Sequence, residues 1–320
     1  MKIIFLGTPE FALPSLEKLY SSRHEILAVV TQMDKPAGRG NKLTASPVKA
    51  FAVKNAIKVL QYEKISRDGL EELKSLNPDL MITAAYGQIL SQAIIDIPKY
   101  GIINVHGSLL PKYRGASPVQ TAVLNGDEET GITIMQTEAG LDTGDILSVV
   151  KTKIGENETA GELMNRLAIL GSDLLLETLD KIEDGTITRA KQQHADATIT
   201  KKINKDECII NWNKSAKQIK CLIHGANPDP IARTLLNDVQ VKIYRAKIAS
   251  IETNETEPGT IISPSSAKAG VFVKCGQGVI EIVEAQLPGG KVLTAKQLFG
   301  GRKFAIGMRF EPVVFPSNMD

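Results

Sequence analysis

Three polar residues near the middle of the chain have the types and spacing to carry hydrogen-bonding and proton-transfer chemistry. Asn104 and His106 flank Val105 at the end of an apolar run. Alternate residues of a strand point to the same side of a sheet, so the amide and the imidazole are expected to converge on one point. Asp142 lies in the later glycine-bounded turn 140–144. Backbone N–H groups can hold a carboxylate in such a turn, which brings Asp142 within reach of the same point.

Each of these residues also has a simpler structural interpretation. A lone histidine is more often structural than catalytic, and we interpret the other histidines, His24, His194 and His224, in that way. An aspartate in a glycine-bounded turn more often forms an Asx turn than takes part in catalysis. Position alone therefore favours His106 over Asp142, and Asp145 competes with Asp142 for the same role.

The composition excludes several other classes of protein. The three cysteines, Cys208, Cys221 and Cys275, lie far apart and form no C-x-x-C pair. This pattern argues against a disulfide framework and a cysteine zinc site, so we expect no metal and a reducing cytoplasm. The apolar start, residues 1–7, is too short for a signal-peptide core or a membrane span. With 320 residues, 42% of them hydrophobic and 23% charged, we expect a globular cytoplasmic protein with two domains.

The first half of the chain alternates short apolar runs with helical patterns. The expected strands are 2–6, 25–31, 79–84 and 101–105, with 131–138 and 145–154 completing the sheet. This alternation predicts an α/β fold with a Rossmann-like, mostly parallel sheet. Helices are expected to begin at Thr8-Pro9, at Ser46-Pro47 and at the capping box Thr159-Ala160-Gly161-Glu162.

A smaller β-rich domain is expected after a polar linker. We predict a catalytic domain at 1–189, a linker at 190–207 and a C-terminal domain at 208–320. In the last of these, a helix at 213–224 precedes short strands at 239–249, 259–263, 270–274 and 279–285, which is typical of a small, OB-like β-barrel. Residues 201–320 carry 17 lysines and arginines against 11 acidic residues, although the whole chain has a net charge of only +2. Such an excess fits a solvated face or a polyanionic partner.

The expected sheet carries no nucleotide-binding motif. Its first strand runs into Gly7-Thr8-Pro9-Glu10-Phe11, which lacks the further glycines of a dinucleotide fingerprint and the Gly-Lys-Ser/Thr of a phosphate loop. In an open α/β sheet the ligand site lies outside the carboxyl ends of the strands. Because Asn104 and His106 stand at such an end, we expect the site there.

Several motifs together resemble the folate-dependent formyltransferases. They are Asn104-Val105-His106-Gly107-Ser108-Leu109-Leu110-Pro111, the segment 112–118 that follows it, the turn 140–146, and the segments 5–11 and 35–40. The resemblance extends more weakly through 202–212 and 223–230, where Asp229 stands at the place of a tryptophan that is usual in the family. As a whole, the chain is most similar to the members that act on methionyl-tRNA in translation initiation. The resemblance therefore implies 10-formyltetrahydrofolate as donor and the amino group of methionyl-tRNA as acceptor.

The resemblance gives the three candidate residues catalytic roles. Attack of an amine on a formyl carbon builds a tetrahedral species with an oxyanion, which Asn104 and His106 are suited to stabilise. The nitrogens must also exchange protons, for which Asp142 and His106 are the candidates. No covalent acyl-enzyme is needed because an amine is already a competent nucleophile.

Two further groups of residues are implied to bind the substrates. The folate is expected against residues that follow two of the strands, namely Tyr86, Gly87, Ser108, Leu109, Leu110 and Pro111. The acceptor end of the tRNA is expected against basic residues of one loop, namely Lys35, Arg39 and Lys42, with Arg39 as the main contact. We expect a monomer.

Three other functions are compatible with these residues. A formyltransferase for an amino sugar nucleotide or glycinamide ribonucleotide shares the same core, although the ribonucleotide enzyme would need only the first domain. A hydrolase that passes the formyl group to water could use the same oxyanion site. A non-enzymatic RNA-binding protein on this fold is disfavoured by the intact Asn104, His106 and Asp142.

Overall fold

The computed structural model describes residues 1–37, 42–251, 256–262, 270–301 and 303–313. Its internal contacts divide the chain into two units. The first contains residues 1–118, 129–152 and 164–200, and the second contains residues 119–128, 153–163 and 201–320. The segment predicted as a linker is thus shared, because its residues up to Thr200 belong to the first unit. The predicted boundaries at 189 and 208 stay a prediction.

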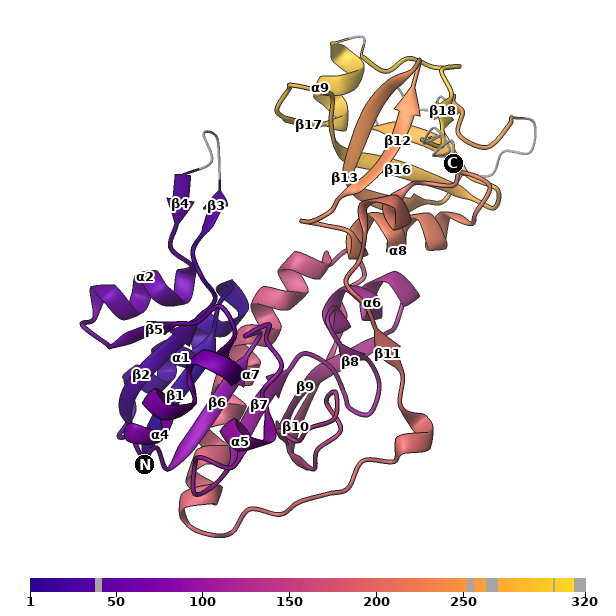
Figure 1. Cartoon of the computed structure of the whole chain (residues 1–320). Helices are drawn as coiled ribbons and strands as arrows, with labels where there is room; N and C mark the ends of the chain where they lie inside the picture. The colour runs from indigo at the N-terminus through magenta and orange to yellow at the C-terminus, as the bar shows by residue number, and fades with distance from the viewer. Residues whose placement is uncertain (38–41, 252–255, 263–269, 302, 314–320) are drawn as a thin grey trace, which may run out of the picture. The chain divides into compact units, whose positions relative to one another are not determined.

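Seven strands form the central sheet of the first unit, in the order β10-β9-β7-β6-β1-β2-β5 (Figure 1). Their bounds are β1 Lys2–Gly7, β2 Glu25–Thr31, β5 Val59–Gln61, β6 Leu80–Ala84, β7 Ile102–His106, β9 Glu129–Gln136 and β10 Ile146–Lys153. The five strands from β5 to β7 are paired in parallel, and β9 runs antiparallel to β7. The predicted Rossmann-like, mostly parallel sheet is confirmed. Its strand order reverses between β1 and β6, which is the switch point where such sheets bind ligands.

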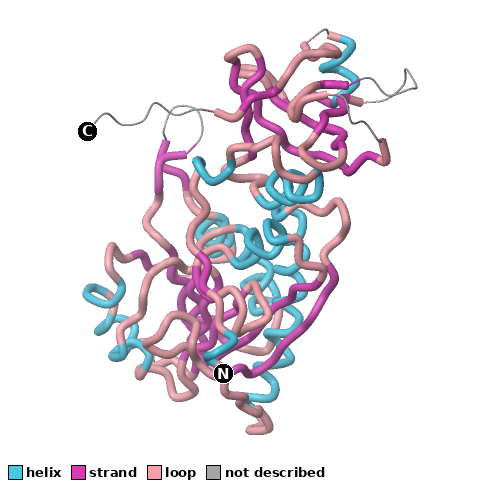
Figure 2. Tube along the Cα trace, turned by 90° about the vertical axis from the view of Figure 1, so that its right-hand side faces the viewer, coloured by secondary structure: helices cyan, strands magenta, loops and turns pink. Residues whose placement is uncertain are grey.

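Helices cover both faces of this sheet, which explains why its inner strands are continuous apolar runs. Figure 2 shows helices on both sides of the strands of the first unit. They are η1 Glu10–Ala12, α1 Leu13–Tyr20, α2 Pro47–Lys54, α3 Ile65–Asp68, α4 Leu70–Ser75, α5 Gln92–Ile95, η2 His194–Asp196 and α7 Ala160–Glu183, which continues into the second unit. On one face Ile102 packs in a cluster with Leu73 of α4 and Ile94 of α5, whereas Val105 lies against Gly171 of α7. Asn104 and His106, which alternate with Val105, therefore lie on the face away from α7.

Two of the three predicted helix starts are confirmed together with their capping residue. At the third, η1 begins at Glu10 directly after Thr8-Pro9, but without the predicted side-chain cap. Ser46 accepts a hydrogen bond from the backbone nitrogen of Lys49 (3.2 Å). Thr159 and Glu162 form the predicted capping box at the start of α7. Thr8 caps no helix, because its hydroxyl finds partners on the neighbouring strands. It accepts from Gln32 N (3.2 Å) and lies 3.4 Å from the Tyr86 carbonyl oxygen, so it ties the ends of β2 and β6 beside β1.

The second unit is a small antiparallel barrel with one principal covering helix. Its sheet has the order β14-β15-β16-β13-β12-β18, with β17 against β16. The bounds are β12 Ala232–Leu236, β13 Val239–Ala249, β14 Ile261–Ile262, β15 Val271–Lys274, β16 Val279–Gln286, β17 Val292–Thr294, β18 Phe310–Glu311, η3 Lys205–Cys208, α6 Pro118–Asn125, α8 Ala216–Gly225 and α9 Ala295–Gly300. Ile261 N donates to Met308 O and Phe310 N to Gly259 O, each at 2.8 Å. These bonds join the two edges, so the predicted barrel is nearly closed.

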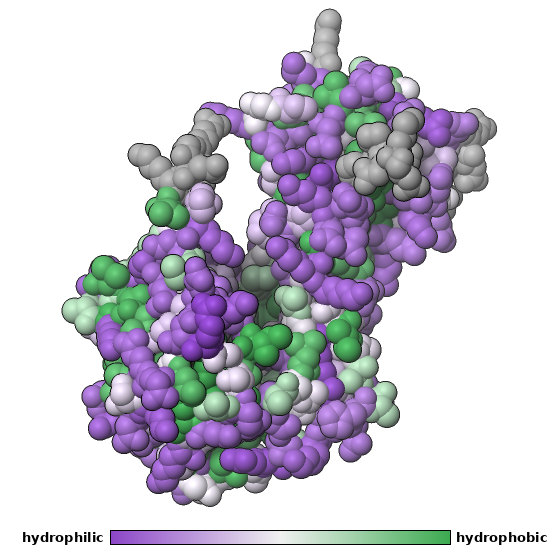
Figure 3. Space-filling view, in the orientation of Figure 1, coloured by the Kyte–Doolittle hydropathy of each residue, from purple (hydrophilic) through white to green (hydrophobic). Residues whose placement is uncertain are grey.

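The barrel has its own core and a polar outside. Trp212 stacks on Phe310 with the ring centres 5.3 Å apart, and its Nε1 donates to the Thr234 hydroxyl (2.9 Å). On the face seen in Figure 3 the barrel unit is mostly hydrophilic. The strands β12, β17 and β18 and the helix α9 were not predicted from the sequence.

Two small strand pairs complete the first unit. The strands β3 Lys35–Ala37 and β4 Lys42–Thr44 form a hairpin. The strands β8 Arg114–Gly115 and β11 Ile199–Thr200 pair in parallel. None of the helices that the structure describes is long and apolar enough to cross a membrane.

Candidate active site

Asn104 is held as a hydrogen-bond donor by the neighbouring strand. It lies opposite Thr83 of β6 in the sheet register. The Thr83 hydroxyl lies 2.9 Å from Asn104 Oδ1 and, less closely, 3.3 Å from the Ile103 carbonyl. Within the described chain the Asn104 Nδ2 group donates to no other residue. The register of β6 and β7 therefore orients the amide so that its N–H₂ group is left for a substrate.

His106 is buried and has one ring nitrogen directed at a backbone carbonyl. The residue is 5% exposed, and its Nε2 lies 2.9 Å from the carbonyl oxygen of Tyr113. A carbonyl oxygen only accepts, so Nε2 carries a proton. The other ring nitrogen, Nδ1, lies 3.6 Å from Asp142 Oδ2. Nδ1 is thus the atom through which this imidazole can exchange a proton with a substrate, and Asp142 is the counter-ion when the ring is charged.

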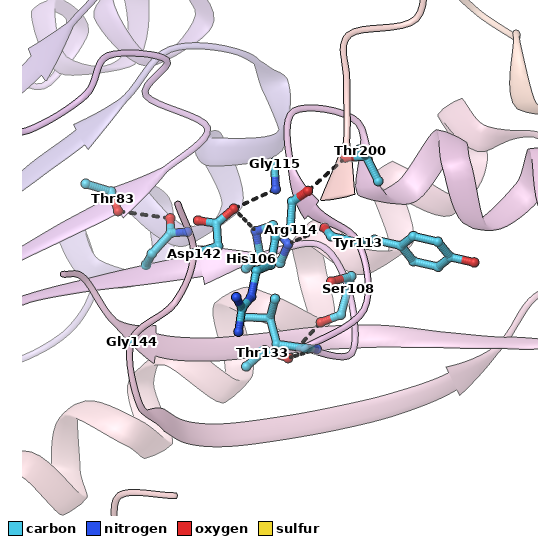
Figure 4. Close-up of polar contacts among 12 residues, drawn as sticks. Thr83, His106, Ser108, Tyr113, Arg114, Gly115, Thr133, Asp142, Gly144 and Thr200 are labelled. Atoms are coloured by element: carbon cyan, nitrogen blue, oxygen red, sulfur yellow. Dashed lines mark hydrogen bonds and ion pairs between the residues drawn. The ribbon is translucent and has the colours of Figure 1, made fainter. Parts of the chain in front are cut away.

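Asp142 reaches His106 from a strained turn. Its backbone is in the left-handed region (φ 49°), and its Oδ2 accepts from the backbone nitrogen of Gly115 (2.8 Å). Figure 4 shows the carboxylate between that nitrogen and the imidazole. The carboxylate thus bonds a distant loop rather than its own turn, unlike in an Asx turn. The competing Asp145 pairs instead with Lys191, at 2.9 Å.

Two glycines make this approach possible. A Cβ atom on Gly144 would collide with the carbonyl oxygen of Gln136. Gly115 has φ +106°, and a Cβ atom there would collide with the carbonyl oxygen of Thr200. The glycines of the two motifs are therefore required by close packing of backbone around the carboxylate.

The loop predicted to bind folate is shaped by its own polar groups. Ser108 is fully buried and donates to the carbonyl oxygen of Lys112 (2.6 Å). The Thr133 hydroxyl donates to Ser108 O (2.7 Å) and accepts from Leu110 N (3.1 Å). The Ser108 hydroxyl is thus used within the loop, and the Leu110 N–H is used by Thr133 of β9. Figure 4 shows the Thr133 hydroxyl beside Ser108. Leu109 and Pro111 are its partly exposed members.

The other residues predicted to bind folate, Tyr86 and Gly87, follow β6, and what they expose is backbone rather than the Tyr86 side chain. The Tyr86 ring is 3% exposed and packs in the apolar cluster below the sheet, and burial raises the pKa of its hydroxyl to about 12. Its carbonyl oxygen accepts from Gln32 Nε2 (3.0 Å). Ala85 and Gly87 on either side are exposed and left-handed, with φ 46° and 86°. The chain therefore turns its backbone outward at the switch point.

Two of the three basic residues predicted to contact tRNA lie on the β3–β4 hairpin. Lys35 belongs to β3 and Lys42 to β4, whereas Arg39 lies outside the described residues. At the base of the hairpin, Lys49 Nζ donates to Asp34 Oδ2 (2.6 Å). This hydrogen bond lowers the pKa of Asp34. The hairpin is thus anchored at the end of β2.

Among the described residues, neither an activated cysteine nor a metal site is found. Burial raises the pKa of Cys208 to about 11 and that of Cys275 to about 12, and it also raises the pKa of Cys221, so none of the three is an activated thiol. In the part of the chain that the structure describes, no group of three or more histidine, cysteine, aspartate or glutamate side chains could hold a metal ion.

The segment 190–200 supplies contacts that the sequence did not indicate. The Thr198 hydroxyl accepts from Tyr113 N (2.8 Å), and Thr198 O accepts from Arg114 N (2.8 Å). Gln192 from the same segment bonds to the Asp142 turn. Single polar residues in a polar segment carry no periodicity or motif, so only the structure reveals these contacts.

Two family models match the chain. One, described as formyl transferase, matches residues 1–179, and one described as formyl transferase, C-terminal domain, matches residues 202–303. The chain is 47% identical over 308 residues to the methionyl-tRNA formyltransferase of Acetivibrio thermocellus, covering 96% of this chain and 98% of that protein. It is 46% identical over 310 residues to the methionyl-tRNA formyltransferase of Pseudomonas putida strain W619, again covering 96% and 98%.

Solved structures show the same fold at lower identity. The N-formyltransferase from Helicobacter canadensis, in complex with folinic acid and dTDP-3-aminofucose, has a TM-score of 0.67 and 22% identity, covering 88% of this chain and 98% of that chain. HypX from Aquifex aeolicus in complex with tetrahydrofolic acid has a TM-score of 0.63 and 15% identity. This match covers 96% of the present chain and 48% of HypX, so the present chain spans about half the length of that protein.

Proposed function

The chain belongs to the formyl transferase family, and we infer that it transfers the formyl group of 10-formyltetrahydrofolate to the amino group of methionyl-tRNA. What carries this proposal is that the similarity to methionyl-tRNA formyltransferases runs through both units, the transfer site and the barrel alike. Folate-bound neighbours of the same fold support the donor.

The site residues divide the chemistry of this transfer among them. When the amine attacks the formyl carbon, negative charge develops on the formyl oxygen, and the oriented Nδ2 group of Asn104 donates to it. The protonated Nδ1 of His106 gives its proton to the leaving nitrogen. Asp142 takes the proton that the amine loses and returns it to His106 across the 3.6 Å between them. The bond from the acceptor nitrogen to the formyl carbon forms first, and the bond to the folate nitrogen breaks when the tetrahedral species collapses, with no covalent enzyme intermediate.

The folate is proposed to lie between the Ser108–Pro111 loop and the chain after β6. 10-Formyltetrahydrofolate supplies the formyl carbon when it is bound. The exposed backbone at Ala85 and Gly87 fits a flat heterocycle with donors and acceptors along its edge. The partly exposed Leu109 and Pro111 offer apolar contact. The Tyr86 ring is assigned no direct contact, because it is packed in the core.

The tRNA is proposed to contact the β3–β4 hairpin, through Lys35, Arg39 and Lys42, and the barrel unit. Residues 201–320 have six more basic than acidic residues. Charge of this kind attracts phosphate without reading sequence, so binding is expected to weaken steeply as salt rises. We propose that the protein acts in the cytoplasm as a monomer.

The second candidate function is formyl transfer to a small amine. The fold match to the Helicobacter canadensis N-formyltransferase favours it, because the two share a transfer fold. The basic barrel is unnecessary for so small an acceptor, and we therefore place this function second.

The test is a formylation assay with the purified protein and 10-formyltetrahydrofolate. Methionyl-tRNA, free methionine, an amino sugar nucleotide and water are offered as acceptors in parallel. We expect N-formylmethionyl-tRNA as the main product. The proposal is rejected if methionyl-tRNA is not formylated, and preferential formylation of the amino sugar would establish the second candidate.

A separate measurement tests the hairpin. Arg39→Ala is expected to raise the KM for methionyl-tRNA or lower kcat without weakening folate binding, because it removes a positive charge that is proposed to attract the phosphates of the tRNA. Folate affinity is measured by titration in the absence of tRNA. Loss of folate affinity in this variant would show that the loop belongs to the folate site instead.

A further inference from the structure

A buried glutamine from the segment 190–200 holds the turn that carries Asp142. Gln192 is 5% exposed. Its Nε2 donates to the carbonyl oxygens of Asp142 (2.9 Å) and Gly144 (2.7 Å). Both N–H groups of one amide are therefore used on a single turn, on either side of Thr143. The side chain acts as a clamp across the turn.

The other end of the same amide is held by a buried arginine. Arg114 is 7% exposed, and its Nε and Nη2 donate to Gln192 Oε1 at 3.1 and 2.7 Å. Carbonyl oxygens only accept and a guanidinium only donates. Exchanging the oxygen and nitrogen of the Gln192 amide would break all four contacts, so the amide has one orientation.

The arginine depends on the glutamine in turn. Within the described residues Arg114 forms no ion pair, and its remaining side-chain contact is Nη2 to His194 Nδ1 (3.1 Å). A buried cation that loses its hydrogen-bond partner is strongly destabilising. The pair Arg114–Gln192 is therefore a coupled unit between the Gly115 loop and the Asp142 turn.

We propose that Gln192 is a positioning residue of the formyl-transfer site, which sets the distance between Asp142 and His106 Nδ1, and that Arg114 orients it. The assignment rests on the proposed function for the identity of the reaction. Asp142 reaches His106 and Gly115 from a left-handed backbone, a conformation that is uncommon for non-glycine residues although aspartate adopts it more readily than most. The two bonds from Gln192 are made to that backbone. A displacement of about 1 Å in such a site can lower the rate by about 10²-fold.

The test is Gln192→Glu, which keeps the size of the side chain. The carboxylate still accepts from Arg114, but an oxygen replaces the nitrogen that faces the carbonyls of Asp142 and Gly144. We expect kcat to fall about 10- to 100-fold while the KM values for folate and methionyl-tRNA stay within about twofold. We also expect the ¹⁵N chemical shift of His106 Nδ1 to move, because its carboxylate neighbour is displaced.

The matched control is Gln193→Glu, the same change of charge at the next residue, which is exposed and whose side chain forms no hydrogen bond or ion pair among the described residues. It is expected to leave kcat and the His106 ¹⁵N shift unchanged. An equal loss in both variants, or a kcat for Gln192→Glu within about twofold of the wild type, would overturn the proposal.

A second variant covers the case in which Gln192→Glu does not fold. Arg114→Lys keeps the buried charge but loses one of the two hydrogen bonds to Gln192 Oε1. We therefore expect kcat to fall about three- to tenfold and the ¹⁵N chemical shift of His106 Nδ1 to move. A normal kcat with an unmoved His106 ¹⁵N shift in this variant would reject the positioning role. If the wild type formylates no methionyl-tRNA, the proposed function fails, and the ¹⁵N shifts of the variants still decide the positioning of Asp142.

Discussion

The end of β7 and the segment from Ala190 to Thr200 both contribute to the proposed catalytic site, but in different ways. The strand supplies two of the side chains proposed to act on the substrate, Asn104 and His106. The segment instead holds the loops around them, through Gln192 on the Asp142 turn and Thr198 on the Tyr113 loop. Groups that act on a substrate are constrained in type and spacing by chemistry. Groups that hold a loop need only be close to it in space.

The largest effect on kcat is expected at Asp142, because Gln192 holds its backbone and its carboxylate faces His106. Asp142→Asn keeps an acceptor for Gly115 N and tolerates the left-handed backbone, but loses the charge and the proton acceptor. We expect kcat to fall by about 10²–10⁴-fold in single-turnover formylation. Asp145→Asn, which loses an ion pair with Lys191, is the control and should keep kcat. A small effect at Asp142 would mean that it only orients His106.

The next largest effects are expected on the strand itself. Asn104→Ala and His106→Ala should each lower kcat about 10²–10³-fold, because the first removes the donor to the developing oxyanion and the second removes the group that gives a proton to the leaving nitrogen. Val105→Ala is the control on the opposite face of β7. It should lower stability by about 1–3 kcal/mol and leave kcat unchanged. Steady-state kinetics and thermal melts distinguish the two faces, and a catalytic loss in Val105→Ala would contradict their separation.

A smaller effect is expected at the strand that orients Asn104. Thr83→Val keeps the shape but loses the hydroxyl that holds Asn104 Oδ1, so the amide can rotate. We expect kcat to fall about tenfold with an unchanged KM for the folate. Thr137→Val is the matched control, since that buried hydroxyl has no partner in the described residues. An unchanged kcat in Thr83→Val would show that Asn104 needs no orienting partner.

The smallest effect on kcat is expected when the hydrogen bond between Thr198 and Tyr113 is removed. Thr198→Val removes the acceptor for Tyr113 N, while the strand pair β8–β11 still holds the loop. We expect kcat to fall about threefold, because the Tyr113 carbonyl that binds His106 Nε2 becomes less fixed. Thr188→Val, an exposed threonine before the segment, is the control. If Thr198→Val lowers kcat as much as His106→Ala does, the segment 190–200 and the strand β7 contribute equally to the rate.

Much of the fold was predictable because local rules decide it. Continuous apolar runs identified the inner strands, and capping residues identified α2 and α7. The barrel strands β12, β17 and β18 escaped prediction, because each is defined by its pairing with a neighbouring strand rather than by an alternation of apolar and polar residues. Thr8 was misassigned because its hydroxyl bonds across the sheet, a choice that no local pattern contains.

By itself, the sequence determined the chemistry available to this protein. The Asn-x-His spacing on a strand, the aspartate between glycines and the absence of a nucleotide fingerprint could all be read along the chain. Only the tertiary structure decided which nitrogen of His106 faces Asp142, that the Tyr86 ring is buried, and that Gln192, itself bound by Arg114, holds the Asp142 turn. The reason is physical. Residue type and spacing along a strand are local properties, whereas hydrogen bonds between residues distant in sequence depend on how the packed sheet and loops place them.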